Sequence, residues 1–154
     1  MKAVVNGKIV LKNGVLENKV IVFDKKIIDI CDEVPTNCEI IDAKGNYVCP
    51  GLIDIHIHGC KGFDAMDEDE NAVEIISKGL AETGVTSFLP TTMTMSPERI
   101  YKAFENIIKA KNKSIKGAKV LGVHMEGPFI NEKYKGAQLS LIHISEPTRR
   151  VVIS

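Results

Sequence analysis

Residues 50–59 read Pro50-Gly51-Leu52-Ile53-Asp54-Ile55-His56-Ile57-His58-Gly59, and this stretch decides the fold. Its apolar, β-branched content, bounded by Pro-Gly and by Gly, is typical of a short buried strand. Side chains alternate between the faces of a strand, so His56 and His58 are expected on the same side. Two imidazoles on one side of a rigid strand are a natural pair of metal ligands. A strand whose histidines merely lie at a loop mouth has the same pattern.

From this stretch onward, predicted strands and helices alternate. The predicted elements are a strand at about 52–57, a helix at about 70–83 closed by Gly84, a strand at 85–90, a helix beginning at Ser96-Pro97, and a strand at 119–124. The core-facing stripe of the second helix is predicted to be Ile100, Ala103, Phe104, Ile107 and Ile108. Strands about 33 residues apart with a helix in each gap predict βα units and a parallel sheet.

The predicted fold class is α/β, the start of a (β/α)₈ barrel with about three βα units. A doubly wound sheet has the same alternation of strands and helices. Its dinucleotide-binding version is unsupported, because no Gly-x-Gly-x-x-Gly follows a strand. Residues 1–49 contain short β-branched runs separated by turns, with the hairpin-type dipeptides Asn6-Gly7 and Asn13-Gly14. They predict a small antiparallel β unit before the barrel.

The composition excludes several function classes. The chain has 154 residues, of which 44% are hydrophobic, and its 20 basic and 20 acidic side chains cancel. This balance gives no electrostatic case for binding nucleic acid or an anionic membrane. We expect a cytoplasmic protein, because neither a signal peptide nor a membrane-spanning run is visible. Its four cysteines lack Cys-x-x-Cys spacing and are expected to be free thiols.

Chemistry-bearing side chains gather at the expected carboxyl ends of the strands. His56 and His58 follow the first of these strands, and His124 and Glu126 end the third. Barrel enzymes place their sites on this face. Glu126 is therefore the candidate third metal ligand, with a capping or salt-bridging carboxylate as the alternative. His124 is expected to position other groups or to pack as a strand residue, although a ligand or substrate contact remains open.

The predicted donor set combines two imidazoles with a carboxylate. It suits a divalent metal, Zn²⁺ first, with Fe²⁺ or Mn²⁺ as alternatives. Such a metal acidifies a bound water and polarises a carbonyl. The hydroxyls of Thr91 and Thr92 follow the second strand and are expected either to face the site or to serve the strand end. Cys60 lies beyond the Gly59 turn and is not expected to be a ligand.

These residues carry a resemblance. The stretch from Pro50 to Gly59, after a strand ending in Val48-Cys49, resembles the first-strand metal motif of the amidohydrolase superfamily. Residues 124–131, which read His-Met-Glu-Gly-Pro-Phe-Ile-Asn, are similar to the N-acetylglucosamine-6-phosphate deacetylase family, as are Lys135-Gly136-Ala137-Gln138. Asp64-Ala65-Met66 and Phe88-Leu89-Pro90-Thr91-Thr92 fit the same family. The resemblance covers about residues 1–138.

The resemblance implies a fold and a reaction. The family pairs a small β-sandwich with a metal-bearing barrel and hydrolyses N-acetylglucosamine 6-phosphate to glucosamine 6-phosphate and acetate. Carried over, Glu126 is a metal ligand, and His56 and His58 are ligands where a second metal is held, so one or two ions are implied. Ala137 and Gln138 match the substrate-contacting pair. A homodimer is what the family suggests for the full-length protein.

The sequence also departs from the family. The resemblance calls for two further histidines and an aspartate general base from later strands, and three βα units cannot close a barrel of roughly 200 residues or more. Residues 139–154 do not continue the pattern, and they resemble the translation of a sequencing-library adapter. His143 and Glu146 are therefore expected to carry no function.

We accordingly expect three parts: a β-sandwich portion at 1–49, a truncated amidohydrolase barrel at 50–138, and a non-native tail at 139–154. The chain alone is expected to be an inactive amino-terminal fragment that holds no catalytic residue. Two other interpretations stay open. One is a different metal-dependent amidohydrolase, such as a deaminase or a cyclic amidase. The other is a metal-binding module without catalysis.

Overall fold

The computed structural model describes residues 1–128, 130 and 132–138, which form two compact units. One unit spans Met1–Pro50, and the other begins at Gly51. The predicted tail at 139–154, with His143 and Glu146, lies outside the described residues, as do Phe129 and Asn131. Among the residues that the structure describes, neither helix has the length and apolar character needed to cross a membrane.

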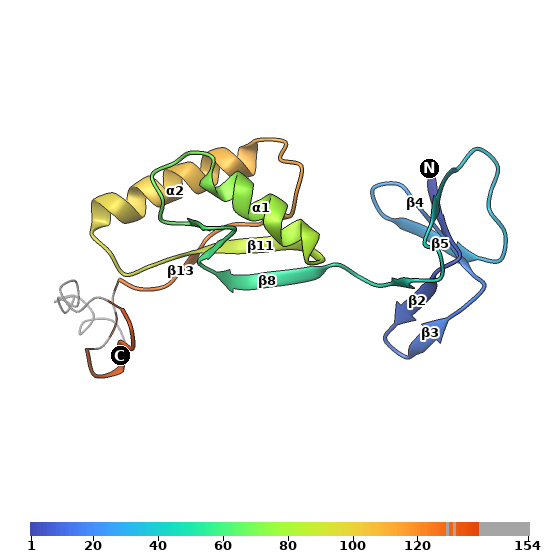
Figure 1. Ribbon diagram of the computed structural model, residues 1–154, viewed down its shortest axis with the longest axis horizontal. Coiled ribbons are helices and arrows are strands. Elements are labelled where there is room, and N and C mark those ends of the chain that lie inside the picture. Colours follow the sequence, from blue (N-terminus) through green and yellow to red (C-terminus); the bar gives the residue numbers. More distant parts are fainter. Residues whose placement is uncertain (129, 131, 139–154) are drawn as a thin grey trace, which may run out of the picture. The chain divides into compact units, whose positions relative to one another are not determined.

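The first unit consists of two small sheets (Figure 1). One sheet has the strand order β5-β4-β1-β6, and the other has the order β3-β2-β7. The strands are β1 (Lys2–Val5), β2 (Lys8–Leu11), β3 (Gly14–Leu16), β4 (Val20–Phe23), β5 (Ile27–Cys31), β6 (Glu39–Asp42) and β7 (Tyr47–Val48). Its core contains Ala3, Val20 and Val22, which are all less than 9% exposed.

The prediction of an antiparallel unit is wrong for two of its strand pairs. β1 pairs with β6 in parallel, and β2 pairs with β7 in parallel. The dipeptide Asn6-Gly7 does not close a hairpin, because it carries the chain from β1 in one sheet to β2 in the other. Asn6 has a φ of +55°, and a side chain on Gly7 would meet Val48 Cγ2 at 2.5 Å. The turn residues are therefore needed for a crossover between sheets.

The second unit contains the predicted strands and helices. Its elements are β8 (Leu52–Ile57), β9 (Gly59–Cys60), β10 (Phe63–Asp64), α1 (Ala72–Glu82), β11 (Val85–Thr92), α2 (Pro97–Asn112), β12 (Lys119–Val120), β13 (His124–Met125) and the 3₁₀ helix η1 (Glu132–Tyr134). β11 pairs in parallel with β8 on one side and with β12 and β13 on the other. Helices α1 and α2 lie on the same face of this sheet (Figure 1).

The core of the second unit lies between the sheet and its two helices. Phe88 from β11 is fully buried there, with Ile76 from α1 and Ile107 from α2 at 1% exposure each. The predicted core stripe of α2 is correct for Ile100, Ala103 and Ile107, but wrong for Ile108, which is 54% exposed. Ile108 is therefore a matched exposed counterpart of its buried neighbour.

The predicted third strand is interrupted. β12 pairs with Ser87 and Phe88, and β13 pairs with Thr91 and Thr92, so the break lies beside Leu89 and Pro90. The register between β8 and β11 also shifts between Phe88 and Pro90. Proline has no N–H to donate to a ladder, so Pro90 removes one ladder hydrogen bond on the side that it faces.

β8 lies at an edge of the described sheet, because β11 is its only partner there. Three of its apolar side chains point into solvent: Leu52 is 62% exposed, Ile53 61% and Ile55 64%. The prediction of a buried strand is therefore wrong for these residues. Burial of β8 requires neighbours that the described residues do not supply.

Candidate metal centre

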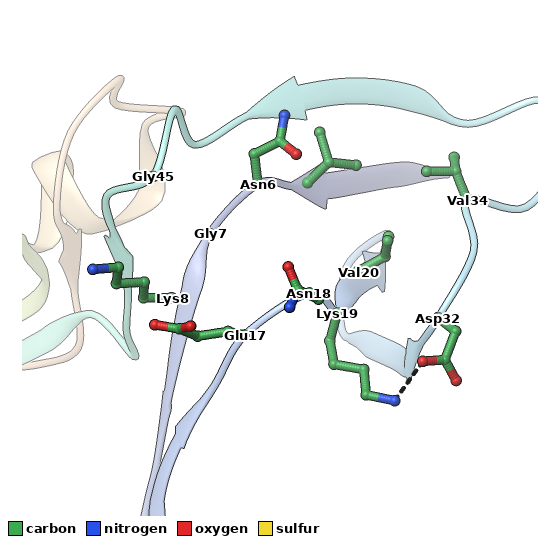
Figure 2. A pocket seen from close by; sticks show the side chains of 11 residues that line it. Asn6, Gly7, Lys8, Glu17, Asn18, Lys19, Val20, Asp32, Val34 and Gly45 are labelled. Atoms are coloured by element: carbon green, nitrogen blue, oxygen red, sulfur yellow. Dashed lines mark hydrogen bonds and ion pairs between the residues drawn. The ribbon is translucent and has the colours of Figure 1, made fainter.

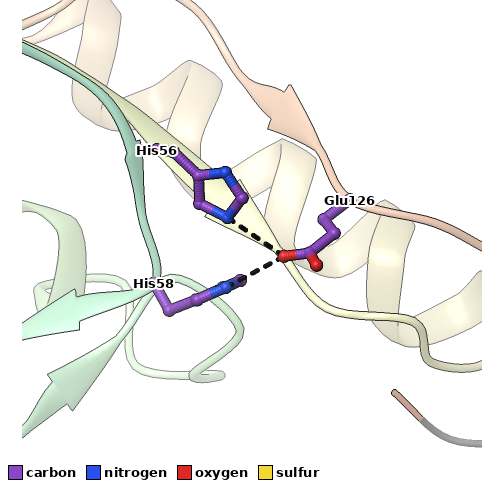
Figure 3. Close-up of side chains that lie close together, drawn as sticks. All are labelled: His56, His58 and Glu126. Atoms are coloured by element: carbon purple, nitrogen blue, oxygen red, sulfur yellow. Dashed lines mark hydrogen bonds and ion pairs between the residues drawn. The ribbon is translucent and has the colours of Figure 1, made fainter. Parts of the chain in front are cut away.

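Three side chains from the carboxyl ends of two strands converge in the second unit (Figure 3). His56 is the penultimate residue of β8, His58 directly follows β8, and Glu126 directly follows β13. Glu126 Oε2 lies 3.1 Å from His56 Nε2 and 3.0 Å from His58 Nε2. The imidazole centroids are 5.3 Å apart. The three donor atoms lie within 4.8 Å of one another, so the structure brings the three predicted ligands together, and their binding of a metal stays a prediction.

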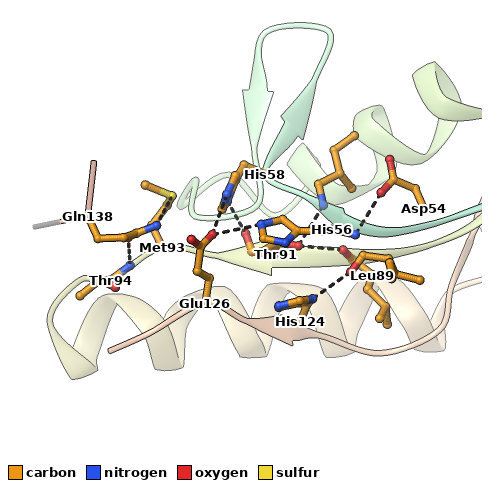
Figure 4. A network of polar contacts seen from close by, with 12 residues as sticks. Asp54, His56, His58, Leu89, Thr91, Met93, Thr94, His124, Glu126 and Gln138 are labelled. Atoms are coloured by element: carbon orange, nitrogen blue, oxygen red, sulfur yellow. Dashed lines mark hydrogen bonds and ion pairs between the residues drawn. The ribbon is translucent and has the colours of Figure 1, made fainter. Parts of the chain in front are cut away.

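The orientation of His58 follows from its other ring nitrogen. Its Nδ1 lies 3.2 Å from the carbonyl oxygen of Thr91 (Figure 4). A carbonyl oxygen only accepts hydrogen bonds, so Nδ1 is the protonated donor, and in the neutral form of the ring Nε2 carries a lone pair. That lone pair faces the Glu126 carboxylate. Two acceptors 3.0 Å apart need a shared proton or a cation beside them.

The Glu126 carboxyl is in the form that binds cations. Its partial burial raises its pKa, but a hydrogen bond from the Gln138 amide, a hydrogen bond from His56 and the positive charges that His56 and His58 carry when protonated outweigh burial. The net result is a pKa below the usual range for a glutamate. Glu126 is therefore ionised at neutral pH, as a carboxylate ligand must be.

The donor set fits a divalent metal. It offers two imidazole nitrogens and one carboxylate oxygen, the mixture that Zn²⁺ accepts and that Fe²⁺ and Mn²⁺ tolerate. The backbone hydrogen bond to His58 is the outer contact that metal-binding histidines usually make. Cys60 is not part of the group, since its side chain packs against the core beside α1. All four cysteines are free.

His124 lies next to the group without belonging to it. Its Nδ1 donates to the carbonyl oxygen of Ile55 at 2.9 Å, and its ring lies 4.6 Å from that of His56. The main-chain N–H of His56 donates to Asp54 Oδ1 at 3.0 Å. His124 therefore contacts the end of β8 from β13, whereas the Asp54 contact lies within β8 itself (Figure 4). The expected positioning role of His124 fits this geometry and stays a prediction.

The predicted substrate-contacting pair has two different environments. Ala137 is exposed, whereas Gln138 is 7% exposed. Gln138 Oε1 accepts from the main-chain N–H of Thr94 at 2.9 Å, and its Nε2 lies 3.8 Å from Met93 Sδ. Sequence reasoning missed Thr94 and Met93, which have no distinguishing pattern. A substrate contact by Ala137 and Gln138 stays a prediction.

Gly127 connects Glu126 to the loop that follows, and its geometry excludes a side chain. It has a φ of +80°, and an added Cβ would lie 2.0 Å from the buried Thr94 Oγ1. We expect Gly127→Ala to cost about 1–2 kcal/mol for the left-handed backbone alone, plus the cost of the clash, and to displace Glu126. Chemical denaturation and metal titration measure the two effects.

Gly136→Ala is the matched control for this substitution. Gly136 also has a positive φ, of +58°, but an added Cβ would meet no atom of the described part of the chain within 4 Å. It therefore reports the backbone cost without the clash. Equal stability and equal metal affinity in the two variants would contradict the packing role assigned to Gly127.

A second hollow of about 520 Å³ lies in the first unit (Figure 2). Its charged lining consists of Lys8, Glu17, Lys19 and Asp32, and Lys19 Nζ pairs with Asp32 Oδ1 at 2.5 Å. The two positive and two negative charges favour neither an anion nor a cation. This hollow therefore presents no chemistry comparable to the His56–His58–Glu126 group.

Comparison with known proteins gives the family. The amidohydrolase family profile matches residues 47–146, which is more than half of the chain. The chain belongs to the amidohydrolase family. This match includes both histidines and Glu126, and the family assignment confirms the resemblance seen in the first-strand motif.

Similar amidohydrolases narrow this assignment. The chain is 40% identical over 142 residues to N-acetylglucosamine-6-phosphate deacetylase from Bacillus subtilis (strain 168), covering 88% of this chain and 35% of that protein. It is 30% identical over 158 residues to N-acetylgalactosamine-6-phosphate deacetylase from Escherichia coli O157:H7, covering 94% and 41%. It is an amidohydrolase of the N-acetylglucosamine-6-phosphate deacetylase-like type.

A solved structure confirms the predicted fold class. N-acetylglucosamine-6-phosphate deacetylase from Pasteurella multocida superimposes with a TM-score of 0.79 at 32% identity, covering 90% of this chain and 37% of that one. The small sheets followed by parallel βα units therefore match the start of an amidohydrolase barrel. The chain spans about a third of the length of the relatives it matches.

Proposed function

We propose that this chain is the amino-terminal part of a metal-dependent hydrolase that deacetylates N-acetylglucosamine 6-phosphate. The convergence of His56, His58 and Glu126 carries the proposal, because the lone pair of His58 and the Glu126 carboxylate face each other at 3.0 Å. A cation between such donors removes their repulsion. The similarity to the B. subtilis deacetylase supports the substrate.

The chain's own residues have distinct parts in this proposal. His56, His58 and Glu126 would hold the metal, Zn²⁺ first, and Gln138 would orient Glu126 through its amide. The bound metal would activate water and polarise the acetamide carbonyl. Exposed Ala137 would lie where the sugar approaches. The general base is proposed to come from a part of the full-length enzyme other than the residues described.

Acetate release tests the reaction. The protein encoded by the continuous reading frame is assayed beside the 154-residue chain with N-acetylglucosamine 6-phosphate and its N-acetylgalactosamine epimer. A cyclic amide is tested in parallel, with ring opening as the readout because its hydrolysis releases no acetate. We expect turnover of N-acetylglucosamine 6-phosphate by the longer protein and none by the chain, because three βα units do not complete a barrel site. The E. coli relative makes the galacto epimer the second candidate substrate.

The other outcomes identify the alternatives. Preference for the cyclic amide would contradict the sugar deacetylase and favour another amidohydrolase. Stoichiometric metal binding by the longer protein without any hydrolysis would favour a non-catalytic module. Turnover by the 154-residue chain would contradict its assignment as an inactive part.

A further inference from the structure

The link between β8 and β11 is irregular beside the metal-binding histidines. Phe88 pairs with Asp54 and Pro90 pairs with Ile57, so three steps along β8 match two steps along β11. One extra residue therefore lies in β8 at Ile55–His56, immediately before Ile57. Such a bulge re-aims side chains at the cost of ladder hydrogen bonds. Pro90 cannot restore them, since it has no N–H.

Thr91 supplies the missing connection with its side chain. Its Oγ1 accepts the main-chain N–H of Ile57 at 2.9 Å and donates to the carbonyl oxygen of Leu89 at 3.2 Å. Thr91 is fully buried, so its hydroxyl has a fixed environment. The Thr91 hydroxyl thus replaces a backbone carbonyl as the hydrogen-bond acceptor for Ile57, the residue between the two histidines.

The main chain of Thr91 reaches the next residue. Its carbonyl oxygen accepts from His58 Nδ1 at 3.2 Å, which leaves Nε2 facing Glu126. Thr91 therefore makes two contacts at the end of β8: one with the main-chain N–H of Ile57 and one with the ring of His58. The hydroxyl bond keeps Ile57 close to β11, and the hydrogen bond from His58 Nδ1 to the Thr91 carbonyl oxygen needs this short distance.

We propose that Thr91 is a positioning residue for the metal centre, whose hydroxyl anchors Ile57 so that its carbonyl oxygen orients His58. The inference rests on the proposed metal-dependent function. It assigns Thr91 no contact with substrate. Losing an outer partner of a metal-binding histidine costs about 10–100-fold in metal affinity, and this range is the expected effect.

Thr91→Val removes the hydroxyl and keeps the shape, and Thr91→Ser keeps the hydroxyl. Thr92→Val is the matched control, because Thr92 is equally buried and its hydroxyl has no hydrogen-bond partner among the described residues. Titration of the 154-residue chain with Zn²⁺ is expected to show affinity about 10–100-fold lower in Thr91→Val and unchanged in the other two variants. Equal losses in Thr91→Val and Thr91→Ser would overturn the inference.

Two measurements need no metal. Amide hydrogen exchange at Ile57 is expected to be slow in the parent chain, Thr91→Ser and Thr92→Val, and fast in Thr91→Val. Nitrogen NMR of His58 is recorded in the Glu126→Gln background, where no carboxylate competes for the ring proton. It is expected to show protonated Nδ1, and a tautomer mixture once Thr91→Val is added.

The outcomes separate the two proposals. If the parent chain binds no Zn²⁺, the proposed metal-dependent function is wrong. The amide hydrogen exchange of Ile57 and the tautomer of His58 then still test the role of Thr91. An unchanged tautomer in Thr91→Val overturns the positioning role even when Zn²⁺ binds. If Thr91→Val does not fold, Thr91→Ser decides: retained affinity and a protected Ile57 support the inference, and their loss overturns it.

Discussion

Replacing Glu126 with glutamine is expected to lower the Zn²⁺ affinity of the chain by at least about 100-fold, beyond the range for an outer partner. The substitution keeps the shape of the side chain but removes the anionic oxygen that faces His56 and His58 at 3.1 and 3.0 Å. A neutral amide oxygen attracts a divalent cation much less strongly. Competition with a chromophoric chelator measures the affinity.

Glu68→Gln provides the matched control. Glu68 is an exposed carboxylate in the acidic stretch before α1, so the same chemical change removes one negative charge away from the site. It is expected to leave the affinity within a factor of about 2, since exposed charges are screened by salt. Equal losses of Zn²⁺ affinity in the two variants would indicate that binding depends on the net charge of the chain and not on Glu126. Parent-like affinity in Glu126→Gln would rule out Glu126 as a ligand.

Replacing Ile107 with alanine is expected to lower the free energy of unfolding of the second unit by about 2–5 kcal/mol. Ile107 is 1% exposed and packs from α2 into the core that also holds Phe88 and Val120. Alanine would leave a cavity that close-packed neighbours cannot fill. Denaturant unfolding followed by far-UV circular dichroism measures the change.

Ile108→Ala applies the same truncation one residue further along α2. Ile108 is 54% exposed, so the substitution removes little buried surface, and alanine favours the helix more than isoleucine does. We expect a change within about 0.5 kcal/mol of the parent. Comparable destabilisation by both variants would show that Ile108 is also covered, and would contradict the assigned face of α2.

The convergence of His56, His58 and Glu126 was predictable because it depends on architecture more than on detail. Parallel strands place their carboxyl ends at one edge, so His56, His58 and Glu126 converge once the strands are assigned. The two helices could also be predicted from the sequence, because the spacing of their apolar residues indicates where they lie and Gly84 indicates where the first one ends. These features follow from periodicity, which the sequence displays directly.

The remaining features depend on register, which periodicity does not determine. Pairing on both sides of β11 is irregular around Leu89 and Pro90, and only the resulting geometry brings the Thr91 hydroxyl to Ile57. Asn6-Gly7 has the composition of a hairpin turn, yet it serves a crossover because β1 finds its partners further along the chain. Such pairings are tertiary choices, and local propensity does not fix them.

The exposed edge of β8 has a consequence for the behaviour of the chain in solution. Leu52, Ile53 and Ile55 present apolar surface beside unpaired backbone groups, which is a template for strand addition between copies. The strand that leads to the proposed metal ligands His56 and His58 is therefore also where aggregation would begin. Self-association there would crowd the end of β8, so apparent Zn²⁺ affinity should fall as protein concentration rises. Titrations at several protein concentrations, extrapolated to dilution, would report the intrinsic site.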